Sequence, residues 1–287
     1  MDKEKKIFYL GPKTSYTDVA KEELKNKFNL QNYIDVEKRT ITAVASELSH
    51  LENDFNLAVL PIENSIEGIV KESIDNISRV NDENVKILAE CVIPIKHCLI
   101  TYAENIKDIK TIVSHPQAIS QCFDYIFKTF GNNIEYKSES STANAVKNLL
   151  SEDKTVAAIG SLYSAKYYNK PVIAEGINDE KFNQTRFLLV GKMELPIQNC
   201  EYKTSINFST ENKSGALCEI LKILQKYEIN MSYISSRPSK KVFGEYSFYI
   251  DFDGNINEEK VKSAINEILQ YTKIFKYLGS YPKCLYI

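Results

Sequence analysis

The sequence has no tryptophan, and it is poor in histidine and arginine for a chain of 287 residues. Its three scattered histidines and its six cysteines, which form no C-x-x-C pair, provide neither a zinc nor a disulfide framework. We therefore expect buried, reduced thiols and no metal. The net charge of −2 gives no reason to expect nucleic acid or a membrane surface as a partner. No apolar run resembles a secretory signal or could span a bilayer, so we expect a cytoplasmic protein.

Arginine accounts for only four of the 36 basic residues. Lysine thus provides the general positive charge, and a remaining arginine is expected where its planar, bidentate fork is needed. We interpret Arg39 and Arg79, which lie outside any motif, as surface charges. Arg186 and Arg237 lie within motifs and are candidates for recognition.

The segment from Leu57 to Val70 is the most informative part of the chain. An apolar run, Leu57 to Leu60, predicts a buried strand that Pro61 ends, and a helical pattern begins at Ile66. Polar side chains and unpaired backbone N–H groups then lie at the carboxyl end of a strand. Small ligands bind there in open α/β sheets, and a helix N-terminus favours an anion. The segment therefore predicts a small-molecule site.

The first two-thirds of the chain alternates predicted strands and helices, which indicates a mostly parallel sheet covered by helices. Helices are predicted at 17–28, capped by Ser15 or Thr17, and at 117–130. The apolar stretch 86–101 is predicted as one strand that crosses between two lobes. Other strands are predicted at 6–10, 57–60, 111–113, 134–136, 156–159 and 187–190.

The pattern changes after Gly191. Residues 192–203 contain a proline and little periodicity, and we interpret them as a linker. A β-α-β-β-α-β series follows, with strands at 204–209, 229–236, 245–251 and 275–281 and helices at 215–227 and 258–272. This order predicts a ferredoxin-like domain whose sheet buries one face and pairs edge to edge with a second copy.

Five motifs in the first part of the chain, followed by Gly215-Ala216-Leu217 and Ser236-Arg237-Pro238, resemble the prephenate dehydratase family. The five are Tyr9-Leu10-Gly11-Pro12, Pro61-Ile62-Glu63-Asn64-Ser65-Ile66-Glu67-Gly68, Ser114-His115-Pro116-Gln117-Ala118, Ser141-Thr142-Ala143 and Asn183-Gln184-Thr185-Arg186-Phe187. The resemblance implies an α/β fold with a two-lobed, periplasmic-binding-protein-like catalytic region at 1–191, whose active site lies in the cleft. The linker at 192–203 then leads to an ACT regulatory domain at 204–287.

The resemblance also implies the activity. Prephenate would lose carbon dioxide and its ring hydroxyl to give phenylpyruvate in L-phenylalanine biosynthesis, without a metal or organic cofactor and with feedback inhibition by L-phenylalanine. We expect a monofunctional enzyme, because few residues precede the first predicted strand, and a homodimer or tetramer, because the C-terminal sheet is of a kind that often pairs with a second copy. An arogenate dehydratase and a catalytically inactive small-molecule sensor remain alternatives.

Two residues are predicted to be catalytic. The resemblance points to Thr185 as the essential hydroxyl, hydrogen-bonded to the leaving group. Glu63 is predicted as the general acid, if burial raises its pKa; alternatively it caps the next helix or pairs with a lysine.

The other polar residues of the motifs are predicted to bind substrate, each with a structural alternative. Arg186 would pair with a carboxylate or face away, and Phe187 would stack on the ring or begin a core strand. His115 is interpreted as structural. Asn64, Ser65, Ser141 and Thr142 would bind an anion or cap helices, and Ser15, Ser114 and Gln117 would contact substrate in the cleft.

In the C-terminal domain, the resemblance places phenylalanine at a dimer interface formed by Gly215, Ala216, Leu217, Ser236, Arg237 and Pro238. The alternative is that Gly215 only begins a helix and has a structural role in its packing. This chain has Ser214 where the family usually has proline, and Ser235 where it usually has glutamate. The loss of that carboxylate predicts weaker binding of an amino group. In the first loop, Thr14-Ser15 replaces the family's usual Gly-Thr.

Overall fold

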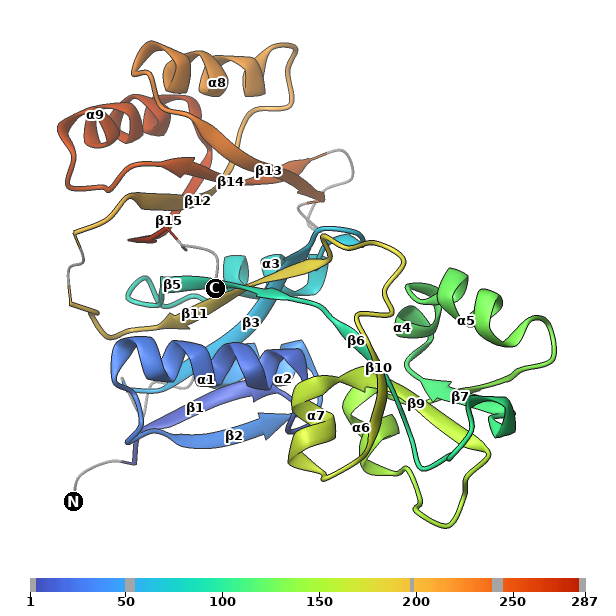
Figure 1. Ribbon diagram of the computed structural model, residues 1–287. Coiled ribbons are helices and arrows are strands. Elements are labelled where there is room, and N and C mark those ends of the chain that lie inside the picture. The colour runs from blue at the N-terminus through green and yellow to red at the C-terminus, as the bar shows by residue number, and fades with distance from the viewer. Residues whose placement is uncertain (1–3, 50–54, 197–198, 239–244, 284–287) are drawn as a thin grey trace.

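The computed structural model describes residues 4–49, 55–196, 199–238 and 245–283. They form two α/β lobes and a C-terminal domain, which lies against the first lobe (Figure 1). The chain crosses between the lobes twice, once between Pro94 and His97 and once between Glu175 and Gln184. The predicted two-lobed α/β fold is therefore confirmed.

The first lobe is built on a sheet with the order β2-β1-β3-β11-β5, to which β4 adds at β3. Helix α1 covers one face of this sheet, and α2 and α3 cover the other. The strands are β1 (Lys6–Leu10), β2 (Ile34–Lys38), β3 (Leu57–Asn64), β4 (Gly68–Ile69), β5 (Lys86–Pro94) and β11 (Gln184–Gly191), and the helices are α1 (Tyr16–Phe28), α2 (Ile41–Ser46) and α3 (Lys71–Arg79).

The second lobe has the sheet order β10-β6-β9-β7-β8. Its strands are β6 (His97–Thr101), β7 (Thr111–Ser114), β8 (Glu135–Ser138), β9 (Val156–Ser161) and β10 (Val172–Glu175), and its helices are α4 (Pro116–Ser120), α5 (Phe123–Phe130), α6 (Thr142–Lys147) and α7 (Leu162–Tyr167). Each lobe's five-strand path contains two parallel and two antiparallel pairings, so the sheets are mixed and the prediction of a mostly parallel sheet is wrong.

Two long predicted elements are each divided in the structure. The stretch 86–101 forms β5 and β6, which belong to different sheets, so it does link the lobes but not as one strand. The helix predicted at 117–130 is interrupted at Gln121 and Cys122. The carboxylate of Asp179 accepts the N–H groups of Asp124 and Tyr125 at 3.1 and 3.3 Å, and so caps a new helix from a distant part of the chain.

Pro61 does not end the strand that begins at Leu57. Strand β1 pairs with β3 only as far as Val59, and Pro61 lies beside a bulge opposite Phe187. A proline without an N–H is tolerated at such a position. The strand therefore continues to Asn64, and helix α3 begins at Lys71, so the predicted helix start at Ile66 is wrong.

The C-terminal domain has the predicted β-α-β-β-α-β order, with an antiparallel sheet β13-β14-β12-β15. Its elements are β12 (Tyr202–Ser209), α8 (Ala216–Lys226), β13 (Met231–Pro238), β14 (Tyr246–Asp253), α9 (Glu259–Ile268) and β15 (Ile274–Pro282). Strand β12 thus begins two residues before the predicted boundary at Thr204.

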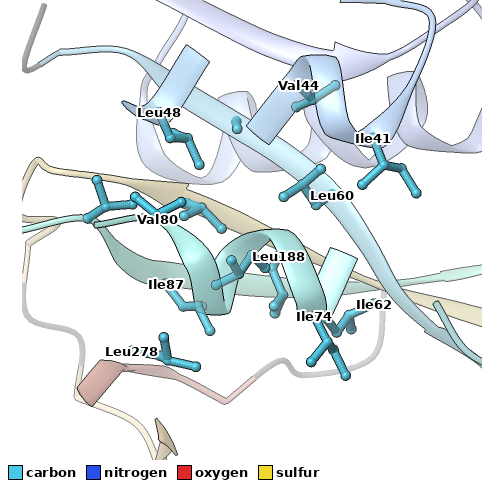
Figure 2. Packing of buried hydrophobic residues seen from close by; sticks show 14 of the residues in the cluster. Ile41, Val44, Leu48, Leu60, Ile62, Ile74, Val80, Ile87, Leu188 and Leu278 are labelled. Atoms are coloured by element: carbon cyan, nitrogen blue, oxygen red, sulfur yellow. The ribbon is translucent and has the colours of Figure 1, made fainter. Parts of the chain in front are cut away.

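Both faces of the C-terminal sheet are covered, so the prediction of one buried face is wrong. Helices α8 and α9 pack on one face. On the other, Leu278 joins the hydrophobic core of the first lobe beside Ile87 (Figure 2). Gly279 permits this docking, because a Cβ atom there would lie 2.4 Å from the Ile87 carbonyl oxygen.

The cysteines only partly follow the prediction. Cys91, Cys98 and Cys122 are buried free thiols, whereas Cys200 and Cys218 are exposed. Cys284 lies outside the described residues. Within the described chain, no helix combines the length and apolar character needed to cross a membrane.

Candidate active site

A cleft of about 630 Å³ lies between the two lobes, and both contribute to its walls. Seven of the eleven residues predicted for catalysis or substrate binding line it. They are Ser15, Asn64, Gln117, Ser141, Thr142, Thr185 and Phe187. The predicted cleft site is therefore present, but its membership differs from the prediction.

Strands β3 and β11 place the central residues. Thr185 lies opposite Asn64 in their antiparallel register, and side chains two residues apart share a face of a strand. Phe187 therefore also faces the cleft, where it lies opposite Pro61 beyond the bulge. Only 2% of Phe187 is exposed, because its ring also packs in the core with α1. Both interpretations of Phe187 are thus compatible with its position.

The Asn64 amide organises this part of the cleft. Its Nδ2 donates to Thr185 Oγ1 at 2.9 Å, to Asn183 Oδ1 at 2.8 Å and to the Gln184 carbonyl at 3.0 Å. Its Oδ1 accepts the N–H groups of Ile66 and Glu67. Because Thr185 Oγ1 accepts from Asn64, the hydroxyl proton of Thr185 remains available to a ligand.

The network continues into the second lobe through amide side chains. Asn183 Nδ2 donates to Gln121 Oε1 at 2.9 Å, and Gln121 Nε2 lies 3.3 Å from Glu67 Oε1. His97 Nε2 lies 3.2 Å from the same Gln121 oxygen, so Nε2 is the protonated nitrogen and donates. Residues from both lobes thereby hold one another across the cleft.

His97 is a neutral residue in the wall of the cleft. Burial lowers the pKa of His97 to about 4, so its ring is uncharged at neutral pH. Its Nδ1 is buried and has no hydrogen-bond partner among the described residues. His97 can therefore accept a hydrogen bond but cannot be the acid that donates a proton at pH 7.

The hydroxyl residues at the edges of the cleft also cap helices. Ser15 Oγ accepts the Asp18 N–H and donates to the Leu10 carbonyl, while Ser141 Oγ accepts the Asn144 N–H. His115 also lines the cleft, and its Nδ1 accepts the Gln117 N–H at 3.3 Å, which agrees with its structural interpretation. These roles fix the side chains that face the cleft.

Thr14, which stands where the family usually has glycine, keeps the backbone conformation that glycine favours, with φ +71°. The Thr14 side chain is buried, and Ser164 of the second lobe donates to its hydroxyl and to its carbonyl. These hydrogen bonds offset the strain of the left-handed conformation and join the lobes.

Two charged residues of the cleft were not predicted. Of the described residues that line it, Arg39 is the one permanent cation and Glu67 the one carboxylate. Arg39 follows β2 directly, is exposed, and makes no ion pair with another described residue. The interpretation of Arg39 as an ordinary surface charge did not anticipate its place at the cleft. The scarcity of arginine could have indicated a role for Arg39, but we used it only for Arg186 and Arg237, which lie inside motifs.

Glu63 and Arg186 do not line the cleft. They lie opposite each other in the register of β3 and β11, and their side chains lie on the opposite face from Asn64 and Thr185. Both line a separate pocket against the C-terminal domain. The pKa of Tyr233 on β13 is raised to about 12, first by burial and second by the charge of Glu63. This effect agrees with the position of Glu63 beside the C-terminal domain. The alternative that Arg186 faces away from substrate is the one that agrees with its position.

Ser65 and Ser114 are also outside the cleft. Ser65 Oγ donates to the Phe182 carbonyl and accepts the Gln184 N–H, so it secures the returning crossing between the lobes. Ser114 is fully buried and donates to the Ile159 carbonyl at 2.7 Å. Both serines satisfy backbone groups, and neither lines the cleft.

The residues predicted for the effector lie in two neighbouring pockets of the C-terminal domain. Gly215, Ala216 and Leu217 line one of about 340 Å³, and Arg237 and Pro238 line another of about 190 Å³. Glu245 and Tyr246 line both pockets. Arg237 is bound to Asp75 on α3, with Nε–Oδ1 at 2.8 Å, and Ser236 is exposed on β13 outside both pockets.

Comparison with known proteins matches this architecture. Residues 7–195 match the family model of prephenate dehydratase, and residues 204–270 match that of the ACT domain. A prephenate dehydratase of Methanocaldococcus jannaschii is 40% identical over 97% of this chain and 98% of its own length. One from Lactococcus lactis is 35% identical over 96% and 97%. The crystal structure of the Arthrobacter aurescens prephenate dehydratase in complex with L-Phe has a TM-score of 0.84 and 29% identity, over 97% of this chain and 90% of that one.

Proposed function

The chain belongs to the prephenate dehydratase family and converts prephenate to phenylpyruvate, and we propose that Thr185, Asn64, Glu67 and Arg39 perform this reaction in the cleft between the lobes. One observation carries the assignment of the centre. The Thr185 hydroxyl accepts a hydrogen bond from Asn64 at the wall of the cleft, which directs its own proton toward a ligand.

The reaction consumes one proton. The bond from the ring to its carboxylate breaks, and the electron pair moves into the ring. The bond to the ring hydroxyl then breaks at the opposite carbon, and a proton completes the water that leaves. The prephenate dianion and one proton thus give the phenylpyruvate anion, carbon dioxide and water. The protein must orient the dianion, assist the departing hydroxyl and leave the ring carboxylate poorly solvated.

Thr185 donates its hydroxyl proton as a hydrogen bond to the departing oxygen. Asn64 fixes this orientation because it fills an acceptor position of Thr185. Glu67 replaces Glu63 as the acid that we assign to proton delivery, since it is the cleft carboxylate of the described residues. His97 is neutral at pH 7, so it does not deliver the proton.

Arg39 binds the carboxylate of the pyruvyl side chain. That carboxylate keeps its charge through the reaction, so a cation there holds substrate and transition state alike. A cation on the ring carboxylate would oppose its loss. Arg39 is exposed at the edge of the cleft and makes no ion pair with another described residue, which agrees with a role in substrate capture.

L-phenylalanine inhibits the enzyme from the ACT domain. Its carboxylate binds at Gly215, Ala216 and Leu217, and Glu245 takes the amino group in place of the glutamate that Ser235 replaces. A second copy of the chain completes the site with Ser236, Arg237 and Pro238, so the active form is at least a homodimer. We assign 1–191 to catalysis, 192–203 to the linker and 204–287 to regulation, and we place the enzyme in the cytoplasm.

The test is phenylpyruvate formation by the purified protein with prephenate or arogenate, each with and without L-phenylalanine. Turnover of prephenate that L-phenylalanine suppresses is the expected result. A preference for arogenate would correct the substrate, and a folded protein without turnover of either would contradict the proposal.

A further inference from the structure

The Arg186 side chain joins the strand of the cleft to the C-terminal domain. Only 10% of the side chain is exposed. Its Nε donates to Glu90 Oε2 at 2.6 Å, within the first lobe, while Nη1 donates to Asp251 Oδ2 at 2.6 Å and Nη2 to the Tyr281 hydroxyl at 2.8 Å. The last two partners belong to the C-terminal domain, so one guanidinium bonds to both sides of the interface.

The partners of Arg186 make further hydrogen bonds and ion pairs. Glu90 and Asp251 are 3% and 0% exposed, and Lys203 Nζ lies 3.0 Å from both carboxylate oxygens of Glu90. Ser205 donates to Asp251 and bonds with the Tyr281 hydroxyl. Two cations thus contact two carboxylates in a buried setting, where the loss of one partner leaves another charge without compensation.

This cluster lies between the cleft and the proposed effector pocket. On the catalytic side, Arg186 directly follows Thr185 on β11. On the regulatory side, Asp251 is on β14, and the same strand begins at Tyr246, which lines the effector pocket together with Phe248. One strand on each side therefore connects a ligand site to the cluster.

We propose that Arg186 is a positioning residue, which makes the placement of Thr185 depend on how the C-terminal domain docks. The guanidinium cannot keep all three partners if β14 shifts relative to β11. Because unpaired charges are costly at this interface, the peptide at 185–186 must move with the domain. A shift caused by the effector thereby displaces the Thr185 hydroxyl. This inference rests on the proposed reaction at Thr185.

The test uses two variants of the C-terminal domain, neither of which changes a residue of the cleft. Asp251→Asn removes one charge, and Tyr281→Phe removes one hydroxyl and preserves the packing. In the full-length protein, we expect kcat to fall by about 2- to 30-fold, more in Asp251→Asn, with KM for prephenate unchanged. Both variants should also weaken inhibition by L-phenylalanine, since they remove contacts through which the domain shift would reach Thr185.

Lys276→Met is the matched control. Lys276 also crosses the interface, but it donates to the carbonyls of Ile77, Ser78 and Val80 at the end of α3, away from β11. Its kcat should equal that of the wild type even where its thermal midpoint falls.

Three outcomes would overturn the inference. The first is wild-type kcat in folded Tyr281→Phe and Asp251→Asn. The second is an equal loss of kcat in the Lys276 control, and the third is an effect on KM alone. If Asp251→Asn does not fold, Tyr281→Phe decides. An inactive wild type would contradict the proposed reaction instead, so the two failures are distinguishable.

Discussion

On one face of β11, Thr185 and Phe187 face a cleft in which neutral amides and hydroxyls bond to one another. On the other face, Arg186 is enclosed by carboxylates and by the C-terminal domain. The two faces are only one residue apart in sequence. The cleft face leaves hydrogen-bonding groups available to a ligand. On the interface face, the charge of Arg186 is neutralised by the carboxylates of Glu90 and Asp251. A single sequence motif therefore serves two sites, because neighbouring strand residues point in opposite directions.

The largest effect is expected at the centre of the cleft face. Thr185→Ala removes the hydroxyl that assists the leaving group, and kcat should fall by about 10²- to 10⁴-fold with little change in KM. Steady-state kinetics of phenylpyruvate formation measure this. Thr185→Ser retains the hydroxyl and should recover much of the rate. A Thr185→Ala variant with near-normal kcat would remove Thr185 from the chemistry.

A variant of Arg39 tests the cation of the cleft without changing the cations of the interface. Arg39→Ala should raise KM for prephenate by about 10- to 150-fold, because a hydrogen bond to a charged group contributes about 1.5 to 3 kcal/mol. Arg39→Lys should recover part of the loss. The control is Arg79→Ala, since Arg79 is exposed and bound to Asp75. Equal KM values in Arg39→Ala and the wild type would exclude this role.

The buried histidine of the cleft predicts a pH-dependent stability. The unfolded chain protonates His97 with a pKa near 6.5, whereas the folded protein does so only near 4. Since the unfolded state binds more protons between these values, stability falls as pH decreases through this window. The contribution from His97 is about 2 kcal/mol between pH 7.5 and pH 5.

Denaturant unfolding at the two pH values measures this difference. His97→Gln retains a donor to Gln121 but does not titrate, so its stability should depend less on pH by that amount. An unchanged pH dependence in the variant would show that the ring is not held neutral.

The smallest effect is expected in the effector pocket. Glu245→Gln should raise the L-phenylalanine concentration for half-inhibition by about tenfold, since it weakens a charged contact to the amino group. The rate without L-phenylalanine should not change. Glu219→Gln is a suitable control, because the Glu219 side chain on α8 is 45% exposed and pairs with Lys222. The assignment of Glu245 fails if both variants are inhibited like the wild type.

The sequence predicted the two-lobed α/β architecture and the C-terminal domain, and it proposed a centre for the site. Alternating strands and helices, the change after Gly191 and the ordered motifs predicted two lobes, a β-α-β-β-α-β domain and a cleft that contains Thr185. Local patterns carry the helices and strands, because they reflect the periodicity of each element, whereas the two lobes and the cleft with Thr185 followed from the resemblance of the motifs to the family.

What could not be predicted depended on pairing between distant strands. The continuation of β3 through Pro61 follows from the end of its pairing with β1 and from the bulge opposite Phe187. That continuation decides which face Glu63 and Asn64 occupy. The break at Gln121 likewise depends on Asp179, 58 residues further along the chain. Arg39 reaches the cleft only because β2 ends beside it.

The most direct test of the two-faced arrangement compares Glu67→Gln with Glu63→Gln in the same assay of phenylpyruvate formation. Both glutamates belong to one motif, but only Glu67 lines the cleft. Glu67→Gln should lower kcat by about 10²-fold or more, and Glu63→Gln should leave it near the wild-type value. The reverse result, with Glu63 essential and Glu67 dispensable, would contradict the division of the motif between cleft and interface.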